Sequence, residues 1–247
     1  MWNYFKKKTN RNTVAPLQVD MHSHLLPDLD DGVTTVEESV SILKQFEELG
    51  YKRVITTPHI LSDFYANTPN SIRQKLELVR KATEKENLAI QVEAAAEYYL
   101  DEVFYASLKS EEEELLTFGS NYILFETGFV NQPAILFEAI FLMKSRGLQP
   151  VFAHPERYEY IQRNYKLAEE LIERGVHLQV NVNSLLGYYS PMAKKIAEKL
   201  VADKKVHWLG TDCHNQKHFN NIKEAIQTPA FTKALDLDLY NHQLNPA

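Results

Sequence analysis

Seven apolar segments recur along the chain at regular intervals, and this repetition restricts its fold more than any other feature. The segments cover residues 17–24, 53–59, 90–99, 122–129, 149–155, 177–183 and 206–214. Each has the length and the β-branched or aromatic content of a buried strand. Helical patterns lie between most of them, and alternation of strand and helix is typical of parallel α/β folds. Seven such units favour a closed barrel over an open sheet.

The helical patterns have recognisable ends. After the first segment, Thr34 and Glu37 match a capping box, and Gly50 is placed to end the helix. The apolar face predicted for this helix consists of Val36, Val40, Leu43 and Phe46.

Two later helices follow the same rules. In the stretch NQPAILFEAIFLMKSRG, Asn131 is the predicted cap, Pro133 an early helical residue and Gly147 the end. In SPMAKKIAEKL, Ser190 precedes Pro191 at a first helical position. No glycine-rich phosphate loop follows any predicted strand, so a nucleotide-binding doubly wound sheet lacks its usual marker.

Length and charge exclude several classes of protein. With 247 residues, 44% of them hydrophobic, the chain is long enough for one domain with a large core. Its net charge is −6, and no long basic block is present, so we expect no nucleic-acid partner. The single cysteine, Cys213, excludes an internal disulfide. No apolar run approaches about 18 residues, so we expect no membrane span.

The N-terminal stretch MWNYFKKKTN is basic and aromatic but lacks the apolar core of a secretory signal. We interpret residues 1–16 as a solvated tail, in preference to a tether to a membrane surface or a partner. Residues 17–247 then form the folded domain, and a cytoplasmic location is expected.

Histidine and acidic residues stand at the ends of the predicted strands. These residues are His22, His24, His59, Glu97, Glu126, His154, Asp212 and His214. In a parallel barrel the carboxyl ends of the strands share one rim, so these side chains should converge. Each of them taken singly could be an ordinary rim histidine or a salt-bridge partner. Together they would repel one another unless cations neutralise them.

The spacing within two segments favours metal binding. Side chains two residues apart in a strand point to the same face, so His22 with His24, and Asp212 with His214, can each hold a shared centre. Imidazole and carboxylate donors suit Zn²⁺, Mn²⁺ or Fe²⁺. The remaining histidines lack this placement and are interpreted as ordinary: His177, His207, His218 and His242.

Six motifs, spread over residues 20–215, resemble a known family: MHSHLLPDLDDG, TTPH, EYYL, HPERY, NSLLGYY and TDCHN. They resemble the PHP superfamily (polymerase and histidinol phosphatase). More closely, they are similar to its protein-tyrosine phosphatases encoded with bacterial capsular and extracellular polysaccharide export systems. The resemblance implies a distorted (β/α)₇ TIM-like barrel, the PHP fold, with a trinuclear metal centre.

Carried onto this sequence, the resemblance implies three groups of metal ligands. The first is His22, His24, Glu97 and Asp212, the second is Glu97, Glu126 and His154, and the third is Asp31, His59 and His214. Asp30 is expected to contact a metal ligand and not a metal ion. Asp31 is one of three nearby aspartates, and its DDG sequence alone is equally typical of a turn. Mn²⁺ is the favoured ion, with Fe²⁺, Zn²⁺ and Mg²⁺ as alternatives.

Such a centre suits phosphomonoester hydrolysis. Glu97 and Asp212 are expected to take part, and Arg157 lies where its fork could hold a phosphoryl oxygen, although it could also be a surface arginine. The implied substrate is phosphotyrosine in the tyrosine-rich tail of a membrane-associated bacterial tyrosine kinase. A thiol mechanism is excluded, because the position that should hold arginine after Cys213 is Phe219.

One position departs from the family pattern. Relatives often carry a second arginine after the TDCHN motif, whereas this chain offers only Lys217 or His218. Tyrosines near the strand ends could line a cleft for an aromatic leaving group or simply pack the rim: Tyr98, Tyr99, Tyr158, Tyr160, Tyr188 and Tyr189.

Three other functions remain open. A phosphatase for a small phosphomonoester such as histidinol phosphate is the main alternative, and an amidohydrolase-type barrel is a weaker one. From a different class, the protein could be a non-catalytic, kinase-binding regulator that keeps metals for stability.

Overall fold

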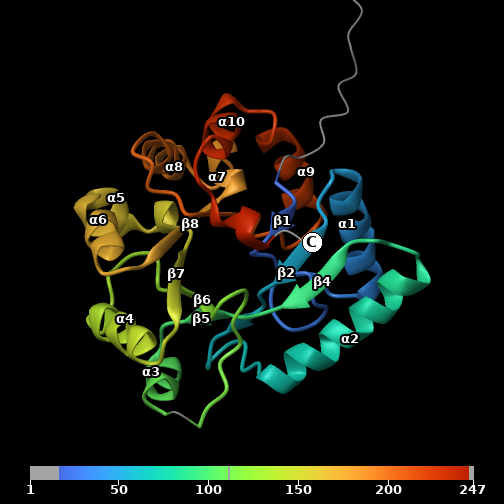
Figure 1. Ribbon diagram of the computed structural model, residues 1–247, viewed down its shortest axis with the longest axis horizontal. Helices are drawn as coiled ribbons and strands as arrows, with labels where there is room; N and C mark the ends of the chain where they lie inside the picture. Colours follow the sequence, from blue (N-terminus) through green and yellow to red (C-terminus); the bar gives the residue numbers. More distant parts are fainter. Residues whose placement is uncertain (1–16, 111, 245–247) are drawn as a thin grey trace, which may run out of the picture.

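A ring of strands surrounded by helices makes up the protein (Figure 1). The computed structural model describes residues 17–110 and 112–244, so the predicted tail at 1–16 lies outside the described residues. The strands are β1 (Val19–Asp20), β2 (Arg53–Thr56), β3 (His59–Ile60), β4 (Gln91–Ala94), β5 (Glu97–Tyr99), β6 (Tyr122–Glu126), β7 (Gln149–Ala153), β8 (His177–Asn181) and β9 (Trp208–Gly210). The longer helices are α1 (Val36–Glu48), α2 (Pro69–Lys85), α3 (Glu102–Lys109), α4 (Leu136–Ser145), α6 (Lys166–Glu173), α8 (Pro191–Ala202) and α9 (Gln216–Ala225). Shorter helical segments are α5 (Glu159–Arg163), α7 (Val182–Leu186), α10 (Pro229–Leu235), η1 (Pro155–Arg157) and η2 (Tyr240–Leu244).

Neighbouring strands pair in parallel throughout the two sheets. One sheet has the order β1-β2-β4 and the other has the order β3-β5-β6-β7-β8-β9. Beyond the ends of β1 and β9, Ser23 pairs in parallel with Cys213, and the His24 amide donates to the Cys213 carbonyl at 2.9 Å. The last strand unit therefore meets the first. The predicted parallel α/β architecture with seven strand units is confirmed.

Two of the predicted strands are interrupted, which the sequence analysis did not predict. The segment 53–59 divides into β2 and β3 on either side of Thr57 and Pro58, and 90–99 divides into β4 and β5. Proline has no amide hydrogen to donate to a ladder, so a strand weakens there. Single bonds still bridge the gap, such as the Glu97 amide to the Pro58 carbonyl at 3.1 Å.

Apolar side chains fill one end of the barrel interior. Among them are Val19, Ile55, Leu124, Val151 and Trp208, all nearly or fully buried. A larger apolar cluster packs the helices against the strands.

The C-terminal segment η2 lies near the centre of the view in Figure 1 and covers the amino end of the barrel. Leu244 joins the interior cluster. The Asn241 amide group donates to the Val19 and Leu209 carbonyls at 3.1 and 2.8 Å, and its oxygen accepts from the Leu209 amide at 3.0 Å. One end of the barrel is thus closed, and the polar rim lies at the other.

The predicted start of α1 is wrong by one residue. Thr35, not Thr34, is the cap, because its hydroxyl accepts from the Glu38 amide at 3.1 Å. Glu38, not Glu37, reaches back to the amide of Thr34. The buried face also differs, since Ser39, Ile42, Leu43 and Phe46 are buried whereas Val36 and Val40 are only half-buried. Gly50 ends the helix as predicted, with φ of 96°.

Of the two later helices, one begins where the sequence predicts. Ser190 caps α8 by accepting from the Ala193 amide at 3.0 Å. In contrast, α4 begins at Leu136 without a side-chain cap, so the predicted cap at Asn131 is wrong. A turn, in which the Leu136 amide donates to the Pro133 carbonyl at 3.1 Å, precedes it instead. Gly147 follows the end of α4 with φ of 72°, as predicted.

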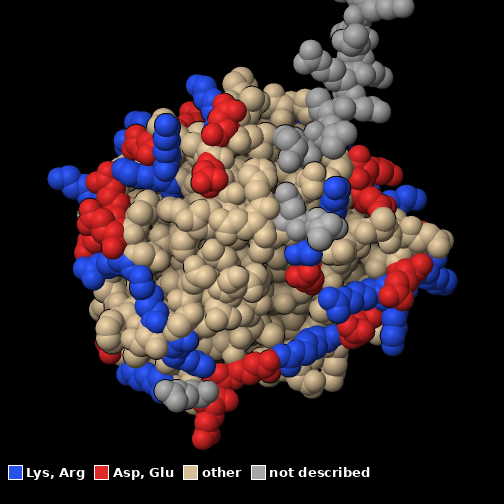
Figure 2. Space-filling model, in the orientation of Figure 1, with Lys and Arg blue, Asp and Glu red and all other residues tan. Residues whose placement is uncertain are grey.

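Charged side chains of both signs surround an uncharged centre on the face shown in Figure 2. Lys and Arg alternate there with Asp and Glu and form no broad basic surface. Among the described residues, no helix has the length and apolar content needed to cross a membrane.

Candidate metal centre

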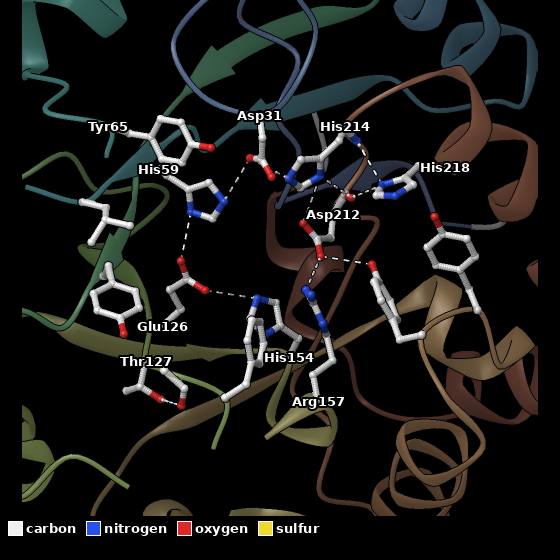
Figure 3. A pocket seen from close by; sticks show the side chains of 16 residues that line it. Asp31, His59, Tyr65, Glu126, Thr127, His154, Arg157, Asp212, His214 and His218 are labelled. Atoms are coloured by element: carbon white, nitrogen blue, oxygen red, sulfur yellow. Dashed lines mark hydrogen bonds and ion pairs between the residues drawn. The ribbon is translucent and has the colours of Figure 1, made fainter. Parts of the chain in front are cut away.

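The side chains that the sequence predicts as metal ligands gather at the carboxyl rim of the barrel. His59 opens β3, Glu97 opens β5 and Glu126 ends β6, while His154 directly follows β7. The parallel arrangement brings these positions to the same end of the barrel. Figure 3 shows several of them converging on one pocket.

The deepest group contains two histidines and two carboxylates. Nε2 of His22 lies 3.2 Å from Oε2 of Glu97 and 3.4 Å from Oδ1 of Asp212. Nε2 of His24 lies 3.4 and 3.5 Å from the same two oxygens. All four residues are buried. Four donor atoms therefore point at one small volume, as in a site for a divalent cation.

A second group shares Glu97. Its Oε1 lies 3.1 Å from Nε2 of His154, and its Oε2 lies 3.2 Å from Nδ1 of His59. Oε1 of Glu126 is 3.0 Å from the same His59 nitrogen, and its Oε2 is 3.8 Å from His154. Glu97 thus faces two groups at once, as a carboxylate that bridges two cations would.

The third group lies nearest to solvent. Oδ1 of Asp31 lies 3.6 Å from Nε2 of His59 and 3.4 Å from Nε2 of His214. The Asp31 side chain is 57% exposed, whereas that of His214 is 10% exposed. His24 stacks on His214 with 3.9 Å between ring centroids and so connects this group to the deepest one. His59 presents its two nitrogens to two different groups, although the resemblance places it only in the third.

Hydrogen bonds to residues outside the three groups orient these ligands. Oδ2 of Asp30 lies 2.7 Å from Nδ1 of His24 and accepts the His59 amide at 2.9 Å. Oε1 of Gln179 lies 2.8 Å from Nδ1 of His22. Such partners fix the ring orientation and the tautomer of a ligating histidine.

Asp212 receives three hydrogen bonds on the oxygen that faces away from His22. Its Oδ2 accepts from Asn181 at 2.6 Å, from Arg157 at 2.9 Å and from the Tyr189 hydroxyl at 3.1 Å. Asp212 also has φ of 51° and His154 has φ of 35°. Non-glycine residues with such backbone angles concentrate at functional sites, where the surrounding structure holds them in place.

The carboxylates strongly affect the protonation of the histidines. Burial alone would lower the pKa of His59, but the charge of Glu97, together with Glu126, outweighs it and raises the pKa to about 9. Carboxylates also raise the pKa values of the other two histidines against their burial: Glu97 and Asp212 act on His22, and Asp30 has the largest effect on His24. Burial would raise the pKa of Glu97, but the neighbouring histidines hold it well below its ordinary value. Both shifts favour the charged forms, so the carboxylates and imidazoles of the cluster stabilise each other's charge.

The donor atoms fit divalent cations. Within each of three groups, the donor atoms of the imidazoles and carboxylates all lie within 4.8 Å of one another: His22, His24 and Asp212; His59, Glu97 and Glu126; and His24, Asp31, His59 and His214. Nitrogen and oxygen donors suit Mn²⁺, Fe²⁺ and Zn²⁺. The buried Cys213 thiol, whose pKa burial raises well above the ordinary value, is 3.7 Å from the Asn215 carbonyl.

The outer groups open into a pocket of about 490 Å³. Arg157 lies on its wall, and its guanidinium carbon is 4.7 Å from the centroid of the Phe129 ring and 4.3 Å from that of Tyr189. Tyr65, Tyr99 and Tyr188 also line the pocket. Of the tyrosines noted in the sequence, Tyr98, Tyr158 and Tyr160 are instead buried outside it.

The sequence did not identify the side-chain amides that connect the ligands to one another. Gln179 donates to Asn181 at 2.8 Å, and the two residues connect His22 to Asp212. The signal was present, because two polar residues at alternate positions interrupt the otherwise apolar segment HLQVNVN.

The structure also distinguishes the two residues that could replace the second family arginine. His218 lines the pocket, with Nδ1 3.1 Å from the Asp212 carbonyl. Lys217 is exposed, and its amine lies 5.6 Å from the centroid of the Tyr188 ring. Of the two, His218 is therefore the residue that faces the pocket.

A parallel α/β barrel with a histidine and carboxylate cluster on its carboxyl rim places the protein in the class of metal-binding α/β barrels. Within that class, the chain belongs to the family described as "Capsular polysaccharide synthesis, CpsB/CapC", whose model matches residues 18–236.

Several relatives are similar over most of their length. The tyrosine-protein phosphatase YwqE of Bacillus subtilis (strain 168) is 29% identical over 212 residues, which are 84% of this chain and 82% of that protein. The tyrosine-protein phosphatase CpsB of Streptococcus pneumoniae is 28% identical over 205 residues, 80% of this chain and 83% of CpsB. A crystal structure from work on YwqE and CpsB, described as unique metal-dependent tyrosine phosphatases, superposes with a TM-score of 0.76 at 25% identity. That match covers 90% of this chain and 96% of the other.

Proposed function

We propose that this protein is a metal-dependent protein-tyrosine phosphatase. The observation that carries the proposal is the pocket in Figure 3, where the ligand cluster, Arg157 and several aromatic side chains share one space. The similarity to tyrosine phosphatases of the same family supports it.

We assign the ligands to three divalent cations. The first is held by His22, His24, Glu97 and Asp212, the second by Glu97, Glu126 and His154, and the third by Asp31, His59 and His214. The short distances within each group support this assignment. Mn²⁺ is the proposed ion, with Fe²⁺, Zn²⁺ and Mg²⁺ as alternatives.

Bound divalent cations supply phosphoryl binding and a coordinated water of lowered pKa. Glu97 and Asp212 keep neighbouring ligand sets in fixed relation, because each contacts more than one histidine. Arg157 donates to Asp212 with one nitrogen, and its planar fork carries further N–H groups that suit a phosphoryl oxygen. The aromatic wall formed by Tyr65, Tyr99 and Phe129 suits the ring of a phosphotyrosine.

The proposed substrate is phosphotyrosine in the tyrosine-rich tail of a membrane-associated bacterial tyrosine kinase. Membership of a capsular polysaccharide family supports this partner, which would place the protein in the cytoplasm and in the control of polysaccharide export.

The test compares three substrates with Mn²⁺-loaded protein: a phosphotyrosine peptide, a phosphoserine peptide and histidinol phosphate. We expect preferred hydrolysis of the phosphotyrosine peptide and loss of activity after chelation. Preference for histidinol phosphate would replace the proposed substrate but leave the metal centre in place.

The variant Glu97→Ala distinguishes an enzyme from a regulator that only binds a kinase. An enzyme loses turnover and metal content together, because Glu97 contacts two ligand groups. A wild-type protein that binds a kinase tail but hydrolyses none of the substrates would contradict the proposal.

A further inference from the structure

The loop between β3 and α2 separates two cavities. It folds back on itself, with the Leu61 amide donating to the Tyr65 carbonyl at 3.1 Å and the Tyr65 amide donating in return at 2.8 Å. Leu61 and Tyr65 line the pocket of the metal centre. Ser62 and Ala66 of the same loop, with Ile60 at the end of β3, line a second cavity of about 250 Å³. A molecule bound in the first pocket therefore needs to cross only this loop to reach the second.

The second cavity is mainly apolar. Tyr98, Val103 and Phe104 supply much of its remaining wall. Its one carboxylate, Asp101, is already bonded, because Oδ2 accepts from the Ser62 amide at 3.0 Å and Oδ1 accepts from the Phe104 amide at 2.8 Å. A cavity of roughly 150 Å³ is enough for a benzene ring, so this one has room for a large aliphatic or aromatic side chain.

An apolar side chain of the cavity wall and one of the loop are exposed. Val103 in its wall is 58% exposed, and Phe64, between Leu61 and Tyr65, is 77% exposed. The loop that carries Phe64 is held in place, since the Asn67 amide group donates to the carbonyls of Leu29 and His59 at 2.7 and 2.9 Å. The surface is thus preformed beside the candidate active site.

We propose that this cavity is a subsite for an apolar side chain of the substrate polypeptide, two to four residues from the phosphotyrosine. The inference rests on the proposed phosphatase function. A substrate chain whose phosphotyrosine fills the first pocket has its neighbouring residues at the rim. An extended chain advances about 3.3 Å per residue, so two to four residues span roughly 7 to 13 Å, enough to cross one folded loop. Phe64 contacts the chain at the crossing, and the cavity accepts the side chain beyond it.

The experiment uses full-length Mn²⁺-loaded protein and phosphotyrosine peptides in which leucine replaces serine at one position at a time, on both sides of the phosphotyrosine. We expect leucine at one position two to four residues away to raise kcat/KM about tenfold, a typical effect of filling an apolar pocket. Val103→Ser and Phe64→Ser should abolish this preference. Both variants should hydrolyse p-nitrophenyl phosphate, which has no peptide to place in the subsite, within about twofold of wild type.

The matched control is Met192→Ser, which removes an exposed apolar side chain, 45% accessible, from α8. This variant should keep the leucine preference. Wild-type activity on all peptides without any positional preference would overturn the subsite and leave the phosphatase proposal intact.

A binding measurement tests the proposed subsite independently of turnover. A fluorescent peptide with a non-hydrolysable phosphonate in place of the phosphate is titrated and followed by anisotropy. Tighter binding of the leucine peptide, lost in Val103→Ser, supports the subsite, and equal Kd values for the leucine and serine peptides overturn it. Absence of p-nitrophenyl phosphate and peptide hydrolysis would separately contradict the proposed function.

Discussion

Arg157 is held more firmly than a surface arginine. Its guanidinium group lies over the rings of Phe129 and Tyr189 and donates to Asp212 at 2.9 Å. These contacts fix the plane of the guanidinium group before a substrate arrives, and fixed geometry of this kind favours binding of two phosphoryl oxygens in that plane.

Replacing Arg157 with lysine should lower kcat/KM for a phosphotyrosine peptide by about 10- to 100-fold, because a point charge replaces the planar fork. Metal content, measured by elemental analysis, should stay at the wild-type level. Arg163→Lys is the control, since Arg163 is exposed and pairs with Glu159 on the surface. Equal losses in both variants would remove Arg157 from the phosphate site.

Metal binding should release protons. In the absence of cations the carboxylates raise the pKa of His59 to about 9, so the ring is protonated at neutral pH, whereas a ligating imidazole must be neutral. Affinity should therefore fall as the pH falls below about 9. Calorimetric titration with Mn²⁺ near neutral pH should give binding enthalpies that differ between buffers of different ionisation enthalpy. His59→Gln should reduce the number of protons released by about one. Identical enthalpies in all buffers would contradict this account.

At the scale of elements, Gly210 allows strand β9 to pass close to its neighbours. A Cβ atom at this position would lie 2.7 Å from Cβ of His22 and 2.8 Å from Nε2 of Gln179. These neighbours form the hydrogen bond that orients His22, so the glycine provides space for the buried network.

Gly210→Ala should destabilise the protein by about 1–3 kcal/mol, the usual effect of overpacking a filled core. Urea unfolding followed by circular dichroism measures this change. Metal content should fall as well, because the added methyl group displaces His22 or Gln179. An unchanged unfolding midpoint together with full metal content would show that the strand can move away.

The strands and the site were predictable because both follow local rules. Apolar segments mark the strands, and polar residues at their ends, such as His59 and Glu126, converge in any parallel barrel. The exceptions depend on contacts between distant residues. Gln179 and His22 are 157 residues apart in sequence, so their hydrogen bond could not be read from either segment. The late start of α4 likewise depends on the neighbouring structure, which overrides weak local preferences. The break at Pro58, in contrast, has a local cause in the sequence, because proline has no amide hydrogen to donate.

At the scale of the whole molecule, Asn241 fastens the C-terminal segment to the closed end of the barrel. Its side chain is buried and satisfies the carbonyls of Val19 and Leu209 and the amide of Leu209. Removing it leaves these backbone groups without partners, and each buried unsatisfied group costs about 1–3 kcal/mol.

Asn241→Ala should therefore lower the free energy of unfolding by about 3 kcal/mol or more, because three backbone groups lose their partner. The activity of the folded protein should stay unchanged, because the ligand cluster lies at the other end of the barrel. His242→Ala, at an exposed neighbouring position, is the control and should leave the unfolding midpoint near that of wild type. If Asn241→Ala loses activity under conditions where it is fully folded, the closed end of the barrel affects the ligand cluster at the other end, and the prediction is wrong.

The pairing of Ser23 with Cys213 has a consequence for synthesis on the ribosome. The first and last ligand pairs flank this junction, His22 and His24 on one side and Asp212 and His214 on the other. Chains emerge and begin to fold from the N-terminus at about 5–20 residues per second. A nascent chain therefore exposes its first two histidines for many seconds before the partners that complete their site leave the exit tunnel. The group of His22, His24 and Asp212 in the candidate metal centre can therefore be completed only when nearly the whole chain has been synthesised.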